Sequence, residues 1–150
     1  MKELYETVLA RLSDQVPELQ EIDLNMGQLD VLNLDIRPSV LFPCALLDIS
    51  LPVCEDNDQE EQLVSARVTV RLAFECPLPT DSKASELRRT AALLLFEIVD
   101  KVYKALQGYG TDEFATFSRK SQVPDNRYAG IKIIDMVFET GFIDATAYQT

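Results

Sequence analysis

The chain has 150 residues, 47% of them hydrophobic, which is typical of a single globular domain spanning residues 1–150. Its formal net charge is −11, and the first half is the acidic one, because residues 1–75 hold 15 acidic and 5 basic groups. Since so acidic a surface repels phosphate groups, we expect no specific binding of nucleic acid.

Residues 2–15 are predicted to form an amphipathic helix, because apolar side chains recur there at spacings of three and four. Pro17 ends this helix. The same stretch carries charge throughout, so it is not expected to be a signal peptide, and no apolar run approaches the ~20 residues that a membrane span needs. Residues 18–43 show no clear period and are predicted to form an irregular connection with one short strand around residues 32–36.

A long antiparallel hairpin is predicted from two stretches in which apolar and polar residues alternate, residues 45–53 and residues 63–75. The second stretch would be about 40 Å long at ~3.3 Å per residue, which exceeds a typical strand. We therefore expect the far end of this hairpin to project beyond the body of the domain.

A second amphipathic helix is predicted to follow the strand-breaking sequence CPLPTDS and to run to Gln107, where Gly108 and Gly110 end it. Residues 115–123 and 131–140 are predicted to form a second hairpin around the turn PDNRYAG. The last strand has apolar side chains on both faces, so we expect it to be central in its sheet or covered by a partner. The buried stripe of the second helix is expected to consist of Leu87, Leu94, Ile98, Val102 and Ala105.

These elements predict an α+β fold in the order helix, hairpin, helix, hairpin. Its sheet is expected to be antiparallel, with about four strands and one long β-hairpin. Both helices are expected to pack on one face of this sheet.

Residues that commonly carry catalysis are scarce in the chain. It contains no histidine, which is the usual general base near neutral pH, and neither a GxxxxGK[ST] nor a GxGxxG phosphate-binding motif. Its three cysteines, Cys44, Cys54 and Cys76, form no CxxC pair and are expected to be reduced thiols in a reducing compartment. Pro124–Asp125 is interpreted as part of a turn, because no ExK motif follows it. We expect no enzymatic activity, no catalytic residue, no cofactor and no metal site, although carboxylates that are dispersed in the sequence can meet in a fold.

The densest negative charge lies in CEDNDQEEQ, residues 54–62, at the predicted hairpin tip. The start of this stretch alternates like a calcium-binding loop, but Glu61 occupies the position that requires glycine and Arg67 the position that requires glutamate. Two interpretations remain open: a solvated turn whose charges deter edge-to-edge aggregation, and a loop that forms an interface or lines a lumen. The five carboxylates concerned are Glu55, Asp56, Asp58, Glu60 and Glu61.

Three stretches carry a resemblance to a known family. They are FPCALLDI at residues 42–49, the long hairpin 45–75 followed directly by ELRRTAALLLFEIVDKVYKALQG, and the closing pair FSRKSQVPDNRYAGIKIIDMVFET. Together with the element order, these stretches resemble bacteriophage tail terminator (tail-completion) proteins, which are small α+β subunits. The resemblance covers about residues 1–142 and consists of patterns of residue class, and the connection 18–43 fits it less well.

The resemblance implies a homo-oligomeric ring, expected to be a hexamer, that halts polymerisation of the tail tube and joins the tail to the head. Its partners would be copies of itself, tail-tube proteins and head-connector proteins. It would assemble in the host cytoplasm and then reside in the virion tail, with DNA passing through its lumen. A negative lumen would repel phosphates, so the acidic loop would suit its lining or a collar. The exposed edges of the predicted sheet also favour self-association.

Other readings of the sequence stay open. A head–tail joining or neck subunit of a phage has a similar size and acidity. Outside virions, a small module that binds a basic protein through its acidic hairpin would explain the same uneven charge. A metal-dependent enzyme is the last alternative.

Overall fold

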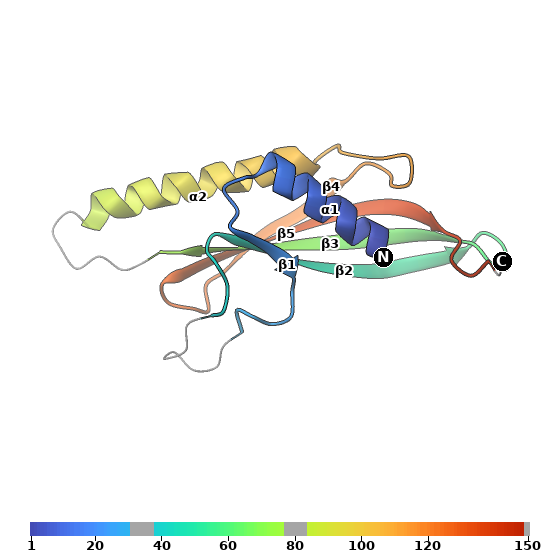
Figure 1. Ribbon diagram of the computed structural model, residues 1–150, viewed down its shortest axis with the longest axis horizontal. Coiled ribbons are helices and arrows are strands. Elements are labelled where there is room, and N and C mark those ends of the chain that lie inside the picture. The colour runs from blue at the N-terminus through green and yellow to red at the C-terminus, as the bar shows by residue number, and fades with distance from the viewer. Residues whose placement is uncertain (31–37, 77–83, 149–150) are drawn as a thin grey trace.

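The computed structural model describes residues 1–30, 38–76 and 84–148, and these form two helices and one five-stranded sheet (Figure 1). Strand β1 runs parallel to β2, and the pairs β2–β3, β3–β5 and β4–β5 are antiparallel, which gives the strand order β1-β2-β3-β5-β4. Along the chain the elements are α1 (Lys2–Gln15), β1 (Glu21–Leu24), β2 (Cys44–Asp56), β3 (Gln62–Glu75), α2 (Ala84–Leu106), β4 (Ser118–Asp125) and β5 (Ile131–Asp144).

The α+β class and the order helix, hairpin, helix, hairpin are confirmed, but the predicted sheet is wrong in two respects. It is mixed and not purely antiparallel, and it has five strands in the described residues, where about four were expected. The additional strand, β1, has only four residues, which is too few to show an alternating pattern in the sequence. The short strand expected around residues 32–36 lies outside the described residues.

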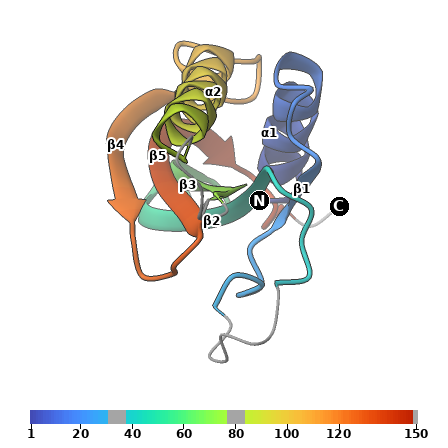
Figure 2. The same ribbon diagram turned by 90° about the vertical axis from the view of Figure 1, so that its left-hand side faces the viewer.

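Both helices lie on the same face of the sheet, as expected, and residues 25–30 and 38–43 of the connection before β2 lie on the opposite face (Figures 1 and 2). The main hydrophobic core fills the space between the helices and the sheet. It is built from every fourth residue of α1 and from alternate residues of the central strands β3 and β5. Its fully buried members include Leu4, Val8, Leu12, Val68, Val70, Leu72, Met136 and Phe138.

A second, smaller core lies on the other face of the sheet. There Leu29 and Val40 from the connection cover Leu46 of β2 and Ile133 of β5. Strand β5 lies between β3 and β4, so the prediction that it is central is confirmed, and its apolar residues on the two faces belong to the two cores. Beyond this second core, the same face of β3 and β5 carries the charged residues Arg67, Arg71, Asp135 and Glu139.

Helix α2 packs on the sheet only through its second half. Leu95, Ile98, Val99 and Val102 are buried, whereas Leu87 is 56% and Leu94 is 55% exposed, so the prediction that these two lie in the buried stripe is wrong. The N-terminal end of α2 extends past the ends of the strands (Figure 1). Gly108 ends the helix as predicted, with a φ of 73° that glycine adopts readily.

Candidate functional site

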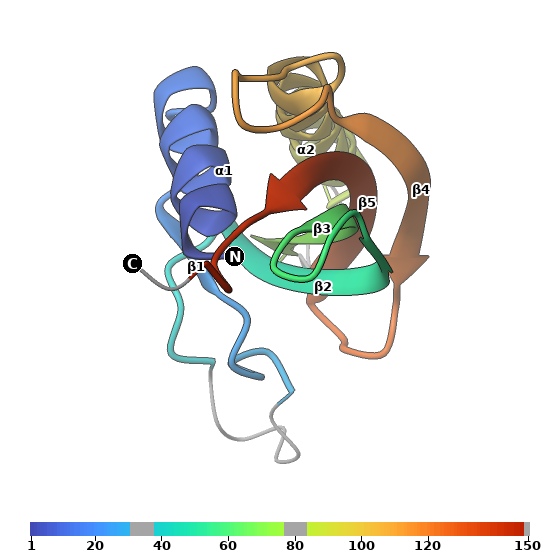
Figure 3. The ribbon, with the colours of Figure 1, turned by 90° about the vertical axis from the view of Figure 1, so that its right-hand side faces the viewer.

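The acidic hairpin tip lies at one end of the long axis of the molecule (Figures 1 and 3). Residues 55–60 are exposed and Glu61 is half-buried, so the five predicted carboxylates do gather on one loop. The loop is closed by the N–H groups of Asn57 and Asp58, which donate to the Glu61 carbonyl at 2.9 and 3.2 Å.

The carboxylates of the tip accept hydrogen bonds from neutral groups. Asp58 accepts from the Glu60 N–H at 2.8 Å and from the Tyr148 hydroxyl at 3.2 Å, and Asp56 accepts from the Gln62 side chain at 2.8 Å. Within the described residues, no arginine or lysine forms an ion pair with any of the five carboxylates. The tip therefore presents negative charge that the described part of the chain does not neutralise.

Apolar side chains flank the tip. Val53, Leu63 and Ile143 are 47%, 48% and 57% exposed, and Leu63 on β3 lies opposite Glu55 on β2 and Ile143 on β5. These apolar residues line a shallow hollow of about 460 Å³ together with the carboxylates Glu55 and Glu113. This end of the molecule thus combines exposed apolar area with one sign of charge.

At the opposite end of the molecule, helix α2 exposes several large apolar side chains. Leu87, Leu93, Leu94 and Phe96 are each more than half exposed. Monomeric soluble proteins usually scatter such residues singly, so four of them close together in one helix make this end of α2 a candidate interaction surface.

A groove of about 600 Å³ runs between the first half of α2 and the adjacent end of the sheet. Its apolar lining includes Leu87, Phe96 and Ile131, and its charged lining consists of Arg88 and Lys132. None of the described residues that line it is acidic. The groove is therefore apolar with a cationic rim, the reverse of the charge at the hairpin tip.

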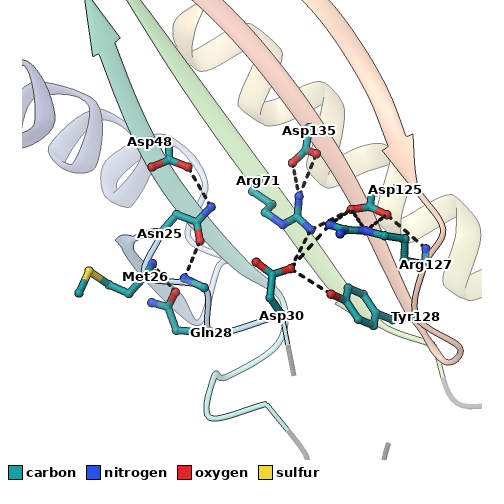
Figure 4. Close-up of polar contacts among 11 residues, drawn as sticks. Asn25, Met26, Gln28, Asp30, Asp48, Arg71, Asp125, Arg127, Tyr128 and Asp135 are labelled. Atoms are coloured by element: carbon teal, nitrogen blue, oxygen red, sulfur yellow. Dashed lines mark hydrogen bonds and ion pairs between the residues drawn. The ribbon is translucent and has the colours of Figure 1, made fainter. Parts of the chain in front are cut away.

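A charged cluster lies on the open face of the sheet, away from the helices (Figure 4). Its centre is Arg71 on β3, whose side chain is only 12% exposed. The Arg71 guanidinium donates to Asp135 on β5 at 3.0 Å and to Asp125 at the end of β4 at 2.9 Å. One arginine thus binds carboxylates on two neighbouring strands.

Two connecting segments close over this cluster (Figure 4). Arg127, from the turn before β5, binds Asp125 with an N–O distance of 2.7 Å, and the Tyr128 hydroxyl donates to Asp30 at 3.0 Å. Hydrogen bonds from Arg127 hold the pKa of Asp125 well below its usual range, whereas burial raises the pKa of Asp135. The cluster therefore joins Asp30, which follows β1, and the β4–β5 turn to the sheet.

This cluster was missed in the sequence, although a signal for it existed. Arg67 and Arg71 alternate with apolar residues on β3, so they had to point to the outer face, and Glu139 and Asp135 stand opposite them on β5. The register of β3 on β5 was needed to see these pairs, because the two strands are far apart in the chain. Asp125, read as a turn residue, is the last residue of β4 and is held by two arginines.

Neither metal-binding clusters nor membrane spans are found in the described part of the chain. Within residues 1–30, 38–76 and 84–148, no three cysteine or acidic side chains come together in a way that could hold a metal ion. In these same ranges no helix combines the length and apolarity that crossing a bilayer requires. All three cysteines are free thiols: Cys44 is buried, Cys76 is half-buried and Cys54 is exposed.

Comparison with known proteins gives little. No family model matches the chain, and no curated protein matches it. Among solved structures, a chain described as "Virion of native gene transfer agent (GTA) particle" is similar over 91% of this chain and 84% of that chain, with 12% sequence identity and a TM-score of 0.42. At a TM-score this low, the similarity carries no argument about fold or function.

Proposed function

We propose that this chain is a structural subunit of a phage-like virion that works by assembling with copies of itself, and that it is not an enzyme. The observation that carries the self-assembly part of this proposal is that four large apolar residues of α2 are exposed outside the core: Leu87, Leu93, Leu94 and Phe96. Leaving side chains of this size in water costs free energy that burial against another subunit recovers, at ~25 cal/mol per Å² of apolar area.

The specific role proposed is that of a tail terminator: a ring that caps the tail tube, contacts the head connector and lets DNA pass. The support for it is the resemblance of residues 1–142 to that family, together with the helix–hairpin–helix–hairpin order of the fold. The acidic first half of the chain suits a passage through which DNA slides, because like charge prevents sticking. The subunit would assemble in the host cytoplasm and remain in the virion tail.

Electron microscopy of particles that lack this protein tests the role. Overlong tails are expected for a tail terminator, because nothing would then stop the tube from growing. Normal tails detached from heads would instead identify a head–tail joining subunit. Particles of normal form and infectivity would overturn the virion role altogether.

A small acidic binding module is the second candidate, and the hairpin tip favours it, because its carboxylates have no cationic partner among the described residues. Such a module would capture a basic cellular protein. Replacing Glu55, Asp56, Asp58, Glu60 and Glu61 by their amides would abolish that capture while leaving the fold intact.

A further inference from the structure

We propose that the hairpin tip of one copy docks against the first half of α2 of a second copy, so that the copies join head to tail. This inference rests on the self-assembly part of the proposed function and names the two surfaces that meet. The tip surface consists of the acidic loop with Val53, Leu63 and Ile143, and the α2 surface consists of Leu87, Arg88, Phe96 and Lys132, which line the groove by α2.

The positions of the two surfaces suit a head-to-tail contact. The tip lies at one end of the long axis and the free end of α2 at the other (Figure 1). A contact between two different surfaces of the same chain is heterologous, and such contacts generate a ring if the rotation closes and a filament if it does not. One interface of this kind, repeated, is sufficient to build a closed ring.

The chemistry of the two surfaces is complementary. Each has exposed large apolar residues at its centre, and each has charge of one sign: Glu55 and Glu113 line the hollow by the tip, and Arg88 and Lys132 line the groove by α2. Glu86 and Glu97 also lie on α2 but do not line that groove. Apolar burial would supply most of the affinity, and the opposite charges would set orientation and partner choice.

Charge also argues for a head-to-tail contact over a symmetric one. Each copy carries a net charge of −11, so two copies repel unless unlike charges meet locally. A two-fold contact of α2 with α2 would bring Arg88 and Lys132 of one copy towards the same cations of the other. A two-fold contact of tip with tip would bring two sets of carboxylates together. Of these three pairings, that of the tip with α2 is the one that opposes unlike charges.

The same contact decides between the two readings of the acidic loop. A tip that docks on the neighbouring subunit forms an interface, so Glu55, Asp56, Asp58, Glu60 and Glu61 would not line the lumen. The remaining acidic groups of residues 1–75 are then the ones available to face passing DNA.

Two blocked variants of the full chain test the inference by sedimentation. In the first, Leu87→Asp and Phe96→Asp put charge on the α2 surface, and in the second, Leu63→Lys and Ile143→Lys put charge on the tip surface. All four side chains are about half exposed or more, so the changes spare the core. Met26→Asp serves as the control, because Met26 is 75% exposed and belongs to neither surface.

The head-to-tail contact predicts a distinctive pattern. Each blocked variant alone should lose at least about 30-fold in self-association, which corresponds to the burial of one or two large apolar side chains. A one-to-one mixture should form a heterodimer of twice 16.9 kDa and nothing larger, because one intact tip and one intact α2 surface remain. The Met26→Asp control should associate like the original chain.

Other outcomes overturn the inference. If the tip-blocked variant alone still associates as the original chain does, the tip is not part of the contact, although self-assembly itself stands. If each variant is monomeric and the mixture stays monomeric, the two surfaces do not meet each other. A blocked variant that loses its circular dichroism spectrum is replaced by Arg88→Glu on α2 or by Glu55→Lys and Glu60→Lys on the tip, for which the same pattern is expected with a loss of about tenfold.

Discussion

Replacing Arg71 by methionine should destabilise the fold strongly, because it removes the cation that bridges Asp125 and Asp135. Asp125 keeps its contact with Arg127, so the carboxylate that loses its ion pair is that of Asp135. Methionine keeps most of the aliphatic length and removes the charge. The Arg71 side chain is 12% exposed, and those of its two partners are 15% and 27% exposed. Breaking a fully buried ion pair costs about 3–5 kcal/mol, since the remaining charge is left without compensation. We expect a loss of about 2–3 kcal/mol in the free energy of unfolding, because water still reaches part of this cluster.

Arg67→Met is the matched control for this change. Arg67 lies on the same strand and the same face, and its Nη2 is 3.0 Å from Glu139 of β5, but the two side chains are 46% and 35% exposed. Exposed pairs of this kind contribute about 0.2–1 kcal/mol. The two substitutions are of the same type on the same strand and face, so the difference between their losses reports the greater burial of Arg71 and its second carboxylate partner.

Urea denaturation at low protein concentration, followed by far-ultraviolet circular dichroism, measures both losses. The Arg71→Met loss should also shrink on acidification. Burial already raises the pKa of Asp135, and removing Arg71 raises that pKa further. The unpaired carboxylate of the variant therefore costs stability at pH values above this raised pKa, where it is charged. At pH values below the raised pKa it is protonated, and the cost disappears. Equal losses for the two variants, or a loss below about 1 kcal/mol for Arg71→Met, would refute the view that this cluster holds the connections to the sheet.

Three further predictions concern other parts of the molecule. Thiol reagents should label the exposed Cys54 in the native protein but not Cys44, because Cys44 is buried and burial raises its pKa to about 11. Mass spectrometry after brief alkylation measures the labelling, and rapid labelling of Cys44 would contradict the prediction. The free energy of unfolding should fall as the pH drops below ~3.9, the unfolded-state pKa of Asp125. The folded-state pKa of Asp125 is lowered, so the stability that its charged carboxylate contributes is present above the unfolded-state pKa and is lost as the pH falls towards the folded-state pKa. Asp125→Asn should flatten this acid dependence, and an unchanged dependence in that variant would contradict the prediction. Leu12→Ala should lower the free energy of unfolding by about 2–5 kcal/mol, since Leu12 is fully buried. Leu93→Ala should change the stability of the monomer by less than about 0.5 kcal/mol, since Leu93 is 59% exposed. A similar loss for both variants in urea denaturation would mean that α2 is packed differently.

The parts of the fold that the sequence predicted are those with strong local patterns. Helix α1 was predicted with its observed bounds, because Leu4, Val8 and Leu12 recur at helical spacing and Pro17 follows. The long hairpin was predicted because β2 and β3 alternate over many residues. Strand β1 was missed because four residues carry too little pattern, and its pairing with β2 depends on contacts distant in sequence.

The candidate site shows the same division. The acidic tip is a local feature, so its five carboxylates could be placed on one loop in advance. The charged cluster joins residues 30, 71, 125 and 135, and the exposure of Leu87 and Leu94 depends on where the sheet ends beneath α2. Periodicity predicts which face of a helix is apolar, but not how much of that face the rest of the fold covers.

Self-assembly is the central claim, and sedimentation of the purified chain across micromolar to near-millimolar concentrations tests it most directly. We expect a species whose mass is a multiple of 16.9 kDa and which negative-stain microscopy shows as a ring. A single 16.9 kDa species at every concentration would contradict the claim.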